Sequence, residues 1–207
     1  MLKADSSQPH DYIRQHKLRL SYMPWLYYSL KEKHLLWARP WQEAIQAQWR
    51  SLETVTLGTN VFIAPSAMLF AEPGRPIVIG DNTTIGAEAV LHGPIEIGSH
   101  VAINHHATLD GGRKGIKIGD RTRLAAYTCL YAFNHGMQAE KPVMSQAVTS
   151  QGISIGSDVW IGAHVGIVDG VTIGNGAVIG MGSLVTHEVL PLTKVAGNPA
   201  KLIGQRT

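Results

Sequence analysis

Residues 153–186 read ISIGSDVWIGAHVGIVDGVTIGNGAVIGMGSLVT, and an aliphatic residue returns there at every sixth position. The same spacing extends back to Leu57, usually with a small or β-branched residue four positions after each aliphatic one. A hexapeptide period is typical of a parallel β-helix, in which each unit forms one short strand and its corner. The aliphatic positions are Leu57, Ile63, Leu69, Ile79, Ile85, Leu91, Ile97, Ile103, Leu109, Ile118, Leu124, Leu130, Ile155, Ile161, Ile167, Ile173, Ile179 and Val185.

The units group in threes, which predicts six triangular coils over residues 53–195. Extra residues occur only between triplets, near 73–77, 111–117 and 131–154, and the last of these predicts a long extruded loop. The second corner is small except at Asn104, and the third accepts bulky residues such as His92 and Asp110. Two corners are therefore expected to be tight, with strained φ angles that favour glycine. The first corner always carries glycine, at Gly58, Gly80, Gly98, Gly119, Gly156 and Gly174.

Residues 1–52 predict a helical cap, and residues 196–207 a C-terminal tail. Trp37, Trp41, Ile45 and Trp49 are four apart and place an apolar stripe on a helix expected to begin near Pro40, with Pro24 and Pro40 separating two short helices. Such a cap would cover an exposed face or unpaired strand edges of the prism. The alternative is a surface that touches a substrate or a membrane-bound carrier.

Composition predicts a cytoplasmic protein. The net charge is only +3 and no Lys/Arg-rich run is present, which argues against a nucleic-acid partner. The single cysteine, Cys129, excludes an internal disulfide framework and indicates a reducing compartment. No apolar run reaches the length of a transmembrane helix, and residues 1–17 lack the apolar segment of a signal peptide.

Two positions depart from the repeat in ways that suggest chemistry. His135 lies at the base of the longest insertion, where an imidazole could act as a general base towards a hydroxyl. A loop histidine that is merely solvated is the alternative. Asn104 stands at a corner that other coils fill with Gly or Ala, and its amide would suit a hydroxylated ligand. Alternatively, asparagine is tolerated there because it readily adopts left-handed φ.

Four motifs between residues 153 and 205 resemble those of the hexapeptide-repeat acyltransferases, most closely the maltose/galactoside and polysaccharide O-acetyltransferase branch. The resemblance covers roughly residues 57–204 and implies a left-handed β-helix, an exception to right-handed crossovers. It further implies a homotrimer with active sites between subunits. His135 matches the family's catalytic histidine, and Asn104, within Asn104-His-His-Ala-Thr108, its acceptor-orienting asparagine. The motifs are Asp158-Val-Trp-Ile-Gly-Ala163, Gly170-Val-Thr-Ile-Gly174, Ile179-Gly-Met-Gly-Ser-Leu-Val-Thr186 and Ala196-Gly-Asn-Pro-Ala-Lys201.

The resemblance also implies a binding site for acetyl-CoA as co-substrate, and no metal. The pantetheine arm would bind backbone groups at the small corners, at positions matching Ala163, Met181 and Thr186. Lys201 would face the nucleotide phosphates as a point charge. Trp160 would pack beside the arm or, alternatively, form a subunit contact. The implied reaction is direct transfer of an acetyl group to a hydroxyl of a sugar or polysaccharide precursor in a ternary complex.

The N-terminal segment departs from the family pattern, because its Trp-rich helix does not match the segment that carries acceptor contacts in maltose-type enzymes. The acceptor pocket is therefore expected to differ. One alternative is an N-acetyltransferase that acts on an amino-sugar nucleotide. Another is a metalloenzyme of the γ-carbonic anhydrase kind, suggested by the spacing of His100 and His105. The third is a non-catalytic assembly scaffold.

Overall fold

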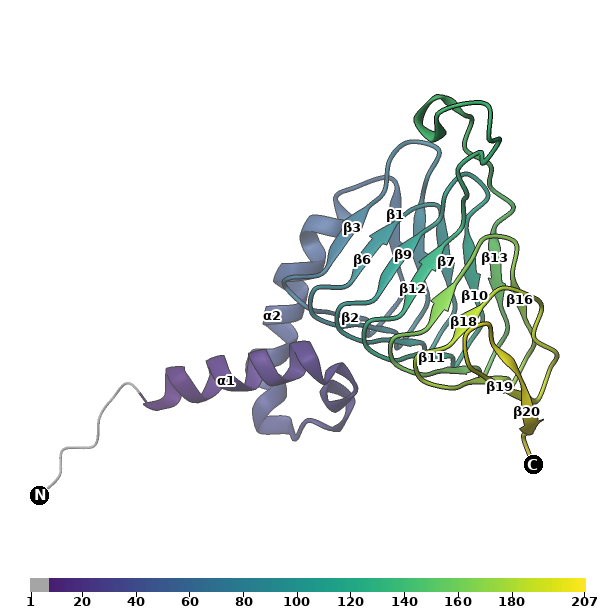
Figure 1. Ribbon diagram of the computed structural model, residues 1–207. Helices are drawn as coiled ribbons and strands as arrows, with labels where there is room; N and C mark the ends of the chain where they lie inside the picture. Colours follow the sequence, from purple (N-terminus) through teal and green to yellow (C-terminus); the bar gives the residue numbers. More distant parts are fainter. Residues whose placement is uncertain (1–7) are drawn as a thin grey trace, which may run out of the picture.

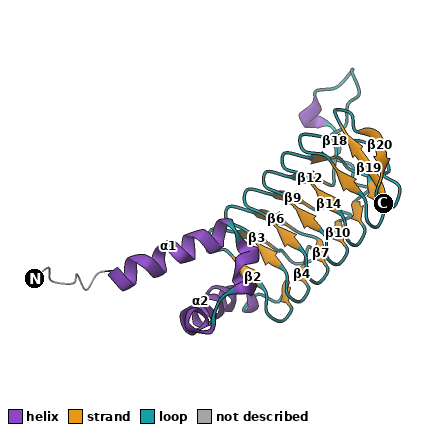
Figure 2. Cartoon of the chain, turned by 90° about the horizontal axis from the view of Figure 1, so that it is seen from below, coloured by secondary structure: helices purple, strands orange, loops and turns teal. Residues whose placement is uncertain are grey.

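A computed structural model describes residues 8–207. The chain winds into coils that each contribute one strand to three parallel sheets, and together the sheets form a three-sided prism (Figure 1). The coils follow one another from the helices at one end to the C-terminus at the other (Figure 2). The predicted parallel β-helix of six coils with a helical N-terminal region is thereby confirmed, and it is consistent with the implied left-handed winding.

Sheet A contains β1 (Val55–Leu57), β4 (Ile77–Ile79), β7 (Ile95–Ile97), β10 (Ile116–Ile118), β13 (Ile153–Ile155) and β16 (Thr172–Ile173). Sheet B contains β2 (Phe62–Ile63), β5 (Thr84–Ile85), β8 (Ala102–Ile103), β11 (Arg123–Leu124), β14 (Trp160–Ile161), β17 (Val178–Ile179), β19 (Thr193–Ala196) and β20 (Lys201–Gln205). Sheet C contains β3 (Met68–Phe70), β6 (Val90–His92), β9 (Thr108–Asp110), β12 (Cys129–Tyr131), β15 (Gly166–Ile167) and β18 (Leu184–Val185). All pairs are parallel except the final pair, β19 and β20.

The core is a column of aliphatic side chains inside the prism. All eighteen repeat positions are buried, from Leu57 to Val185. In-register pairing stacks identical residue types, as when Ile97 of β7 lies between Ile79 and Ile118. Burial of a side chain of this size stabilises the fold by about 1.5–3 kcal/mol, so the repeat largely determines where the chain can turn.

The corners differ from the sequence expectation. The glycines of the first corner have ordinary negative φ angles. They are required instead because successive coils approach closely: a Cβ on Gly80 would lie 2.6 Å from the carbonyl carbon of Gly98. The left-handed angle falls two residues later and is carried mostly by larger residues, including Asn82 at φ 53° and Arg121 at φ 60°. The expectation of strained φ angles at these glycines is therefore wrong. Glycine is needed there because successive coils pack closely.

The helical region comprises α1 (Gln8–Tyr22), the 3-10 helix η1 (Pro24–Ser29) and α2 (Glu32–Arg50). The expected helix start near Pro40 is wrong, because α2 begins at Glu32 and contains Pro40 in its interior. Trp37 and Trp41 pack beside Phe62, while Ile45 and Trp49 pack against the prism core. This tertiary packing on both sides of Pro40 outweighs the backbone hydrogen bond that a proline removes.

Helix α2 replaces the coil that is missing before the first one. The Gln42 side chain donates to the Ile63 carbonyl at 3.1 Å and accepts from the Ile63 N–H at 2.9 Å. Gln46 Nε2 donates to the Val61 carbonyl. These amides bind the backbone groups that an earlier strand would have paired with, so α2 protects the edge of β2 against water and further strand addition.

We expect Gln42→Leu to lower the free energy of unfolding by about 1–3 kcal/mol, because the buried N–H and C=O of Ile63 would lose both partners. Gln48→Leu, at an exposed position of the same helix, is the matched control and should change stability by at most about 0.5 kcal/mol. Urea unfolding followed by circular dichroism measures both. Equal stability of the two variants would show that α2 does not cap β2 through this amide.

All three insertions lie at the C–A corner, where a strand of sheet C leads to the next strand of sheet A. The longest, residues 132–152, rises from the prism (green, at the top of Figure 1) and contains the 3-10 helix η2 (Val143–Ser145). Its stem is paired between Asn134 and Thr149, and its outer part is held by the Gln146 side chain. The loop is therefore an ordered structure attached to the end of β12.

Candidate active site

His135 lies on the stem of the long loop, next to the paired residue Asn134. The Asn134 N–H donates to the Thr149 carbonyl at 2.8 Å, and the reverse bond is 2.9 Å. The His135 ring is exposed and lies edge-on to Phe133, with 6.1 Å between ring centroids. Among residues 8–207 no hydrogen bond reaches its imidazole. The scaffold thus fixes the backbone of His135 while both ring nitrogens remain available to a ligand.

A cleft of about 420 Å³ opens beside this stem at the C–A corner. His92 and Asp110 lie in it one coil apart, with 3.1 Å between His92 Nδ1 and Asp110 Oδ2. The second carboxylate oxygen accepts from the Gly112 N–H at 3.0 Å and lies 3.6 Å from an Arg75 guanidinium nitrogen. The other residues that line the cleft are Gly74, Arg113, Phe133, Val148 and Ser150.

The bonding in this cleft sets what it can bind. With Nδ1–H donating to Asp110, the Nε2 atom of His92 carries the lone pair and can accept a proton or a hydrogen bond. Asp110 already has partners on both oxygens, and Ser150 Oγ donates to the Ala132 carbonyl. Arg75 Nε donates to the Gly93 carbonyl at 2.7 Å, and Glu72 Oε1 lies 4.0 Å from His92 Nε2. The capacity left over is therefore mainly the N–H donors of Arg113 and the remaining ones of Arg75, together with His92 Nε2.

The hexapeptide pattern by itself gives His92 and Asp110 no role beyond bulky residues tolerated at the third corner. The signal was present, because a base and a carboxylate at equivalent positions of successive coils are placed side by side by the register of β6 and β9. The six-residue period therefore predicts the contact between His92 and Asp110 once each unit has been assigned to its sheet.

Asn104 lies at the end of β8, at the B–C corner, where a strand of sheet B leads to the next strand of sheet C. Its φ angle is not left-handed, and that conformation falls at His106, with φ 57°. The alternative explanation of Asn104 as a tolerated left-handed residue is therefore wrong. Its Nδ2 donates to the Leu124 carbonyl at 3.0 Å, while Oδ1 is buried without a partner in the described part of the chain. A buried acceptor without a donor favours a role in ligand binding or in an interface.

The fold does not bring Asn104 and His135 together within one chain. Asn104 precedes β9 in sheet C, whereas His135 follows β12 of the same sheet. Because the strands are parallel, these positions lie at opposite ends of the sheet. A site that uses both residues needs a second copy of the chain.

Ala163 and Met181 share the B–C corner with Asn104. Their backbone N–H groups donate to no acceptor within residues 8–207. The equivalent N–H of an earlier coil, that of Ala87, binds the Ser21 carbonyl of α1 at 2.7 Å. This bond shows that the corner presents N–H groups to an external carbonyl, which is what a pantetheine arm offers. Trp160 lies nearby on sheet B and is 57% exposed.

Thr186 and Lys201 lie elsewhere, in a cleft of about 370 Å³ at the C-terminal end of the prism. Thr186 Oγ1 is 2.8 Å from His187 Nδ1, and Lys201 begins β20. The predicted donor residues therefore form two groups, one along the B–C corner and one at the end of the prism.

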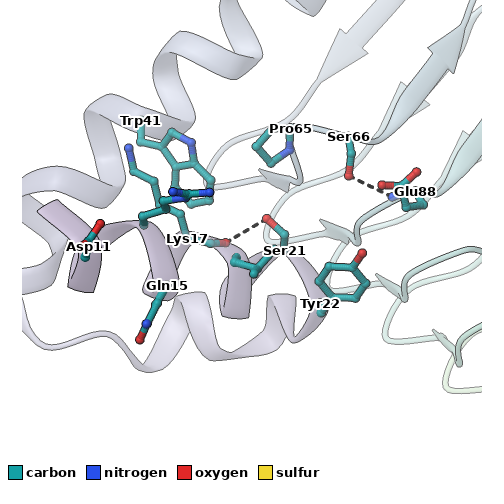
Figure 3. Close-up of a pocket in the computed structure, with 11 residues that line it drawn as sticks. Asp11, Gln15, Lys17, Ser21, Tyr22, Trp41, Pro65, Ser66 and Glu88 are labelled. Atoms are coloured by element: carbon teal, nitrogen blue, oxygen red, sulfur yellow. Dashed lines mark hydrogen bonds between the residues drawn. The ribbon is translucent and has the colours of Figure 1, made fainter.

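A larger cleft than that below the long loop, about 690 Å³, lies between α1 and the B–C corner of the first two coils (Figure 3). It contains none of the residues predicted as site residues. Ser66 and Glu88 of the prism face Ser21 and Tyr22 of α1 across it, and Lys17 lies 5.3 Å from the centre of the Trp41 ring. Tyr22, which lines this cleft, also packs on the ring of His105, the residue after Asn104, with 5.3 Å between ring centroids.

The B–C corner also carries a stack of aromatic rings. His106 and Tyr127 are 4.7 Å apart and nearly parallel, and Tyr127 and His164 are 4.8 Å apart. His105 packs edge-on beside them, and its Nδ1 is buried without a partner in the described residues. Burial, and secondarily the charge of His106, lower the pKa of His105 from its ordinary value.

This pKa shift predicts a pH dependence of stability. A histidine whose pKa is lower in the folded chain binds its proton more readily when unfolded, so stability falls as the pH drops below the unfolded value of about 6.5. This loss of stability remains at pH values below the pKa of His105 in the folded chain. We expect urea unfolding at pH 7.5 and 5.5 to show this loss, and His105→Phe, which keeps the ring contacts, to reduce it. An unchanged pH dependence in the variant would contradict the assignment to His105.

The two histidines behind the metalloenzyme alternative lie at different corners of the prism. His100 and His105 flank β8, one at the A–B corner and the other at the B–C corner. Within residues 8–207 no three His, Cys, Asp or Glu side chains converge in a way that could hold a metal ion. Nor does any helix of that range have the length and apolar character needed to cross a membrane.

Comparison with known proteins gives consistent matches. The model of the family "Bacterial transferase hexapeptide (six repeats)" matches residues 76–111 and 152–187. Nodulation protein L of Rhizobium meliloti is 36% identical over 130 residues, which cover 58% of this chain and 69% of that protein. The probable acetyltransferase Rv3034c of Mycobacterium tuberculosis is 31% identical over 154 residues, 73% of this chain. This chain spans only half the length of that mycobacterial protein.

Among solved structures, a variant of AntD, an N-acyltransferase from Bacillus cereus in complex with dTDP and coenzyme A, superposes with a TM-score of 0.71 and 28% identity. The match covers 78% of this chain and 90% of AntD. The hexapeptide repeat, the three-sided prism and these relatives all indicate the same family. The chain belongs to the hexapeptide-repeat acetyltransferases, the acyl-CoA-dependent acyltransferases built on this β-helix.

Proposed function

We propose that the protein moves an acetyl group from acetyl-CoA to a hydroxyl of a sugar or glycan precursor. The observation that carries this proposal is the cleft beneath the long loop, where an imidazole–carboxylate pair and two arginines lie next to the stem that bears the exposed His135. Its volume of about 420 Å³ lies in the range typical of small-molecule sites. Placement in the maltose/galactoside branch, and a cytoplasmic location, are part of this proposal.

In the proposed mechanism His135 accepts the proton of the acceptor hydroxyl while the oxygen attacks the thioester carbonyl carbon. A bond forms between that oxygen and that carbon, the carbon–sulfur bond breaks, and the proton on His135 passes to the departing thiolate. The unpaired N–H of Ala163 supplies a donor for the oxyanion, which typically contributes more than the base itself. No acyl-enzyme is required, and the thiol of Cys129 contacts no base, its one hydrogen bond in the described residues being to the Tyr127 carbonyl.

We further propose that three copies assemble so that the loop of one copy meets the B–C corner of the next. The outer face of sheet C supports this assembly, because it exposes Met68, Phe70 and Tyr131 to solvent at 49%, 50% and 44%. The outer face of sheet A instead carries polar residues such as Glu96 and Lys117, which pair at 3.4 Å. An exposed apolar face on one side of a prism is typical of a subunit interface. Such packing would also bring Asn104 and His135 of different copies together.

A second candidate is N-acylation of an amino-sugar nucleotide. AntD supports it, since one of its structures holds dTDP-4-amino-4,6-dideoxyglucose and coenzyme A and is 30% identical over 78% of this chain. In this chain Arg75 and Arg113 line the cleft and could bind a diphosphate, the geometry for which guanidinium groups are suited. The non-catalytic scaffold is disfavoured by the available His135 ring and the unpaired corner N–H groups.

The decisive experiment is thiol release from acetyl-CoA in the presence of neutral sugars, glycans and amino-sugar nucleotides. Release with a hydroxyl acceptor supports O-acetylation, and release only with an amine supports the second candidate. If no acceptor responds, calorimetric titration with coenzyme A separates two cases. Binding means that the panel lacked the acceptor class, which a broader panel then tests, whereas no binding contradicts acyl transfer altogether.

A further inference from the structure

A separate groove of about 500 Å³ lies at the A–B corner, over the outer face of sheet B and beside η1. The groove is separate from the clefts at the B–C and C–A corners. Its corner lies at the start of β8, whereas Asn104 lies at the end of that strand. The residues that line the groove include Trp25, Asn60, Asn82, Thr84, His100 and Arg123. None of them belongs to the proposed acyl-transfer site.

The floor of the groove contains an unused hydroxyl. Thr84 is only 2% exposed, and its Oγ1 is buried with no hydrogen-bond partner in residues 8–207. It occupies the outward row of sheet B, in register with Phe62 and Ala102 on the neighbouring strands. A buried hydroxyl left unpaired costs stability unless something else pairs with it. A ligand that enters the groove can do so.

One wall is a row of polar side chains spaced by one coil each. Asn60, Asn82 and His100 all have left-handed φ angles, 51°, 53° and 59°, so the backbone presents them in the same direction. Asn60 Nδ2 donates to Asn82 Oδ1 at 2.8 Å, which leaves the Asn60 oxygen as an acceptor and the Asn82 nitrogen as a donor. The wall therefore offers both donors and acceptors at a regular spacing.

The opposite wall carries an aromatic ring. Trp25 is 47% exposed although it belongs to a helix that packs on the prism. The helix is anchored there by Tyr28, whose hydroxyl donates to the Asn60 carbonyl at 3.0 Å, and burial raises the pKa of that phenol so that it remains a donor. The indole is thus held at the edge of the groove while its surface stays available.

We propose that this groove binds a neutral oligosaccharide. Sugars present apolar C–H faces that pack on an indole, and hydroxyls that act as donor and acceptor, and both kinds of partner are present here. A polyanion is a poorer match, because Arg123 is the only Lys or Arg side chain among the lining residues. The proposal rests on these contacts and not on acyl transfer. If the protein acetylates a glycan, the groove would hold the chain away from its reacting end.

The test uses the full chain without acetyl-CoA, by affinity electrophoresis and calorimetry against maltohexaose, cellohexaose, chitohexaose and a β-1,3-glucan hexamer. The wild type is expected to bind at least one of them. Trp25→Ala and Thr84→Val are each expected to weaken that binding by about tenfold or more. Thr84→Val should not lower stability, because its hydroxyl has no partner in the fold, so it separates binding from folding. Tyr12→Ala, an exposed aromatic residue on α1, is the control and should bind as the wild type does.

No binding of any hexamer by the wild type would overturn the inference, as would unchanged binding by both variants. Thiol release from the same samples with a short acceptor keeps the two proposals apart. Binding that depends on Trp25 in a protein without transferase activity would support the groove and contradict only the proposed function. Transferase activity without Trp25-dependent binding would do the reverse.

Discussion

His135→Ala is expected to lower acceptor-dependent thiol release by about 10²–10⁴-fold, the usual contribution of a positioned general base. The fold should be unaffected, because the ring is exposed and no hydrogen bond of the described structure depends on it. Met144→Ala, at a 94% exposed position of the same loop, is the matched control and should retain full activity. Steady-state kinetics at saturating acetyl-CoA, with a melting curve for each variant, measures both.

Activity of His135→Ala within about twofold of the wild type would remove it from the mechanism. His92 would then be the better candidate for the base, because Asp110 orients its ring through Nδ1 and no hydrogen bond of the described residues occupies Nε2, which lies 4.0 Å from Glu72 Oε1. The pH profile distinguishes the two cases, since loss of the general base should remove the rate increase that accompanies histidine deprotonation.

Gly119→Ala is expected to destabilise the prism by about 3 kcal/mol or more. An added Cβ would lie 2.6 Å from the Ser157 backbone nitrogen and 2.7 Å from the Gly156 carbonyl carbon, both in the next coil. The Ser157 N–H donates to Asn175 Oδ1 at 2.8 Å and the Gly156 N–H donates to the Ile173 carbonyl at 2.8 Å, so neither backbone group can move without losing a hydrogen bond. Urea unfolding of the variant would show the loss as a lower midpoint.

Gly204→Ala in β20 is the control, because a Cβ there meets nothing within 4 Å and its φ angle is not left-handed. Its stability should stay within about 0.5 kcal/mol of the wild type. If both glycine variants were equally stable, the close approach of successive coils would not explain the glycines of the first corner.

The fold could be predicted in detail because one physical demand repeats. Each coil must bury its three aliphatic side chains, so the repeat positions from Leu57 to Val185 predict the number of coils. The insertions between triplets predict the corner at which the loops emerge. The conformation of each corner could not be predicted in the same way. Glycine is compatible with both left-handed φ and close backbone approach, and only the coordinates show that Gly80 serves the second and Asn82 adopts the first.

The candidate site was predicted less completely. His135 and Asn104 stood out because each broke the repeat, but their separation at opposite ends of sheet C followed only from the topology. His92 and Asp110 kept to the repeat and were therefore missed, although the register of successive coils pairs them. Helix α2 begins at Glu32, eight residues before the start expected from Pro40, because the packing of the tryptophans around Pro40 outweighs its helix-breaking tendency.

The proposed active site is shared between copies, with His135 from one copy and Asn104 from another. His135→Ala and Asn104→Ala should each have little activity as pure oligomers. Mixed by denaturation and refolding at equal concentrations, random assembly would give about one site in four with both residues intact, and so about a quarter of wild-type activity. Recovery to that level is the result we predict. No recovery, with mixed oligomers demonstrated by mass spectrometry, would contradict a site built from His135 of one copy and Asn104 of another.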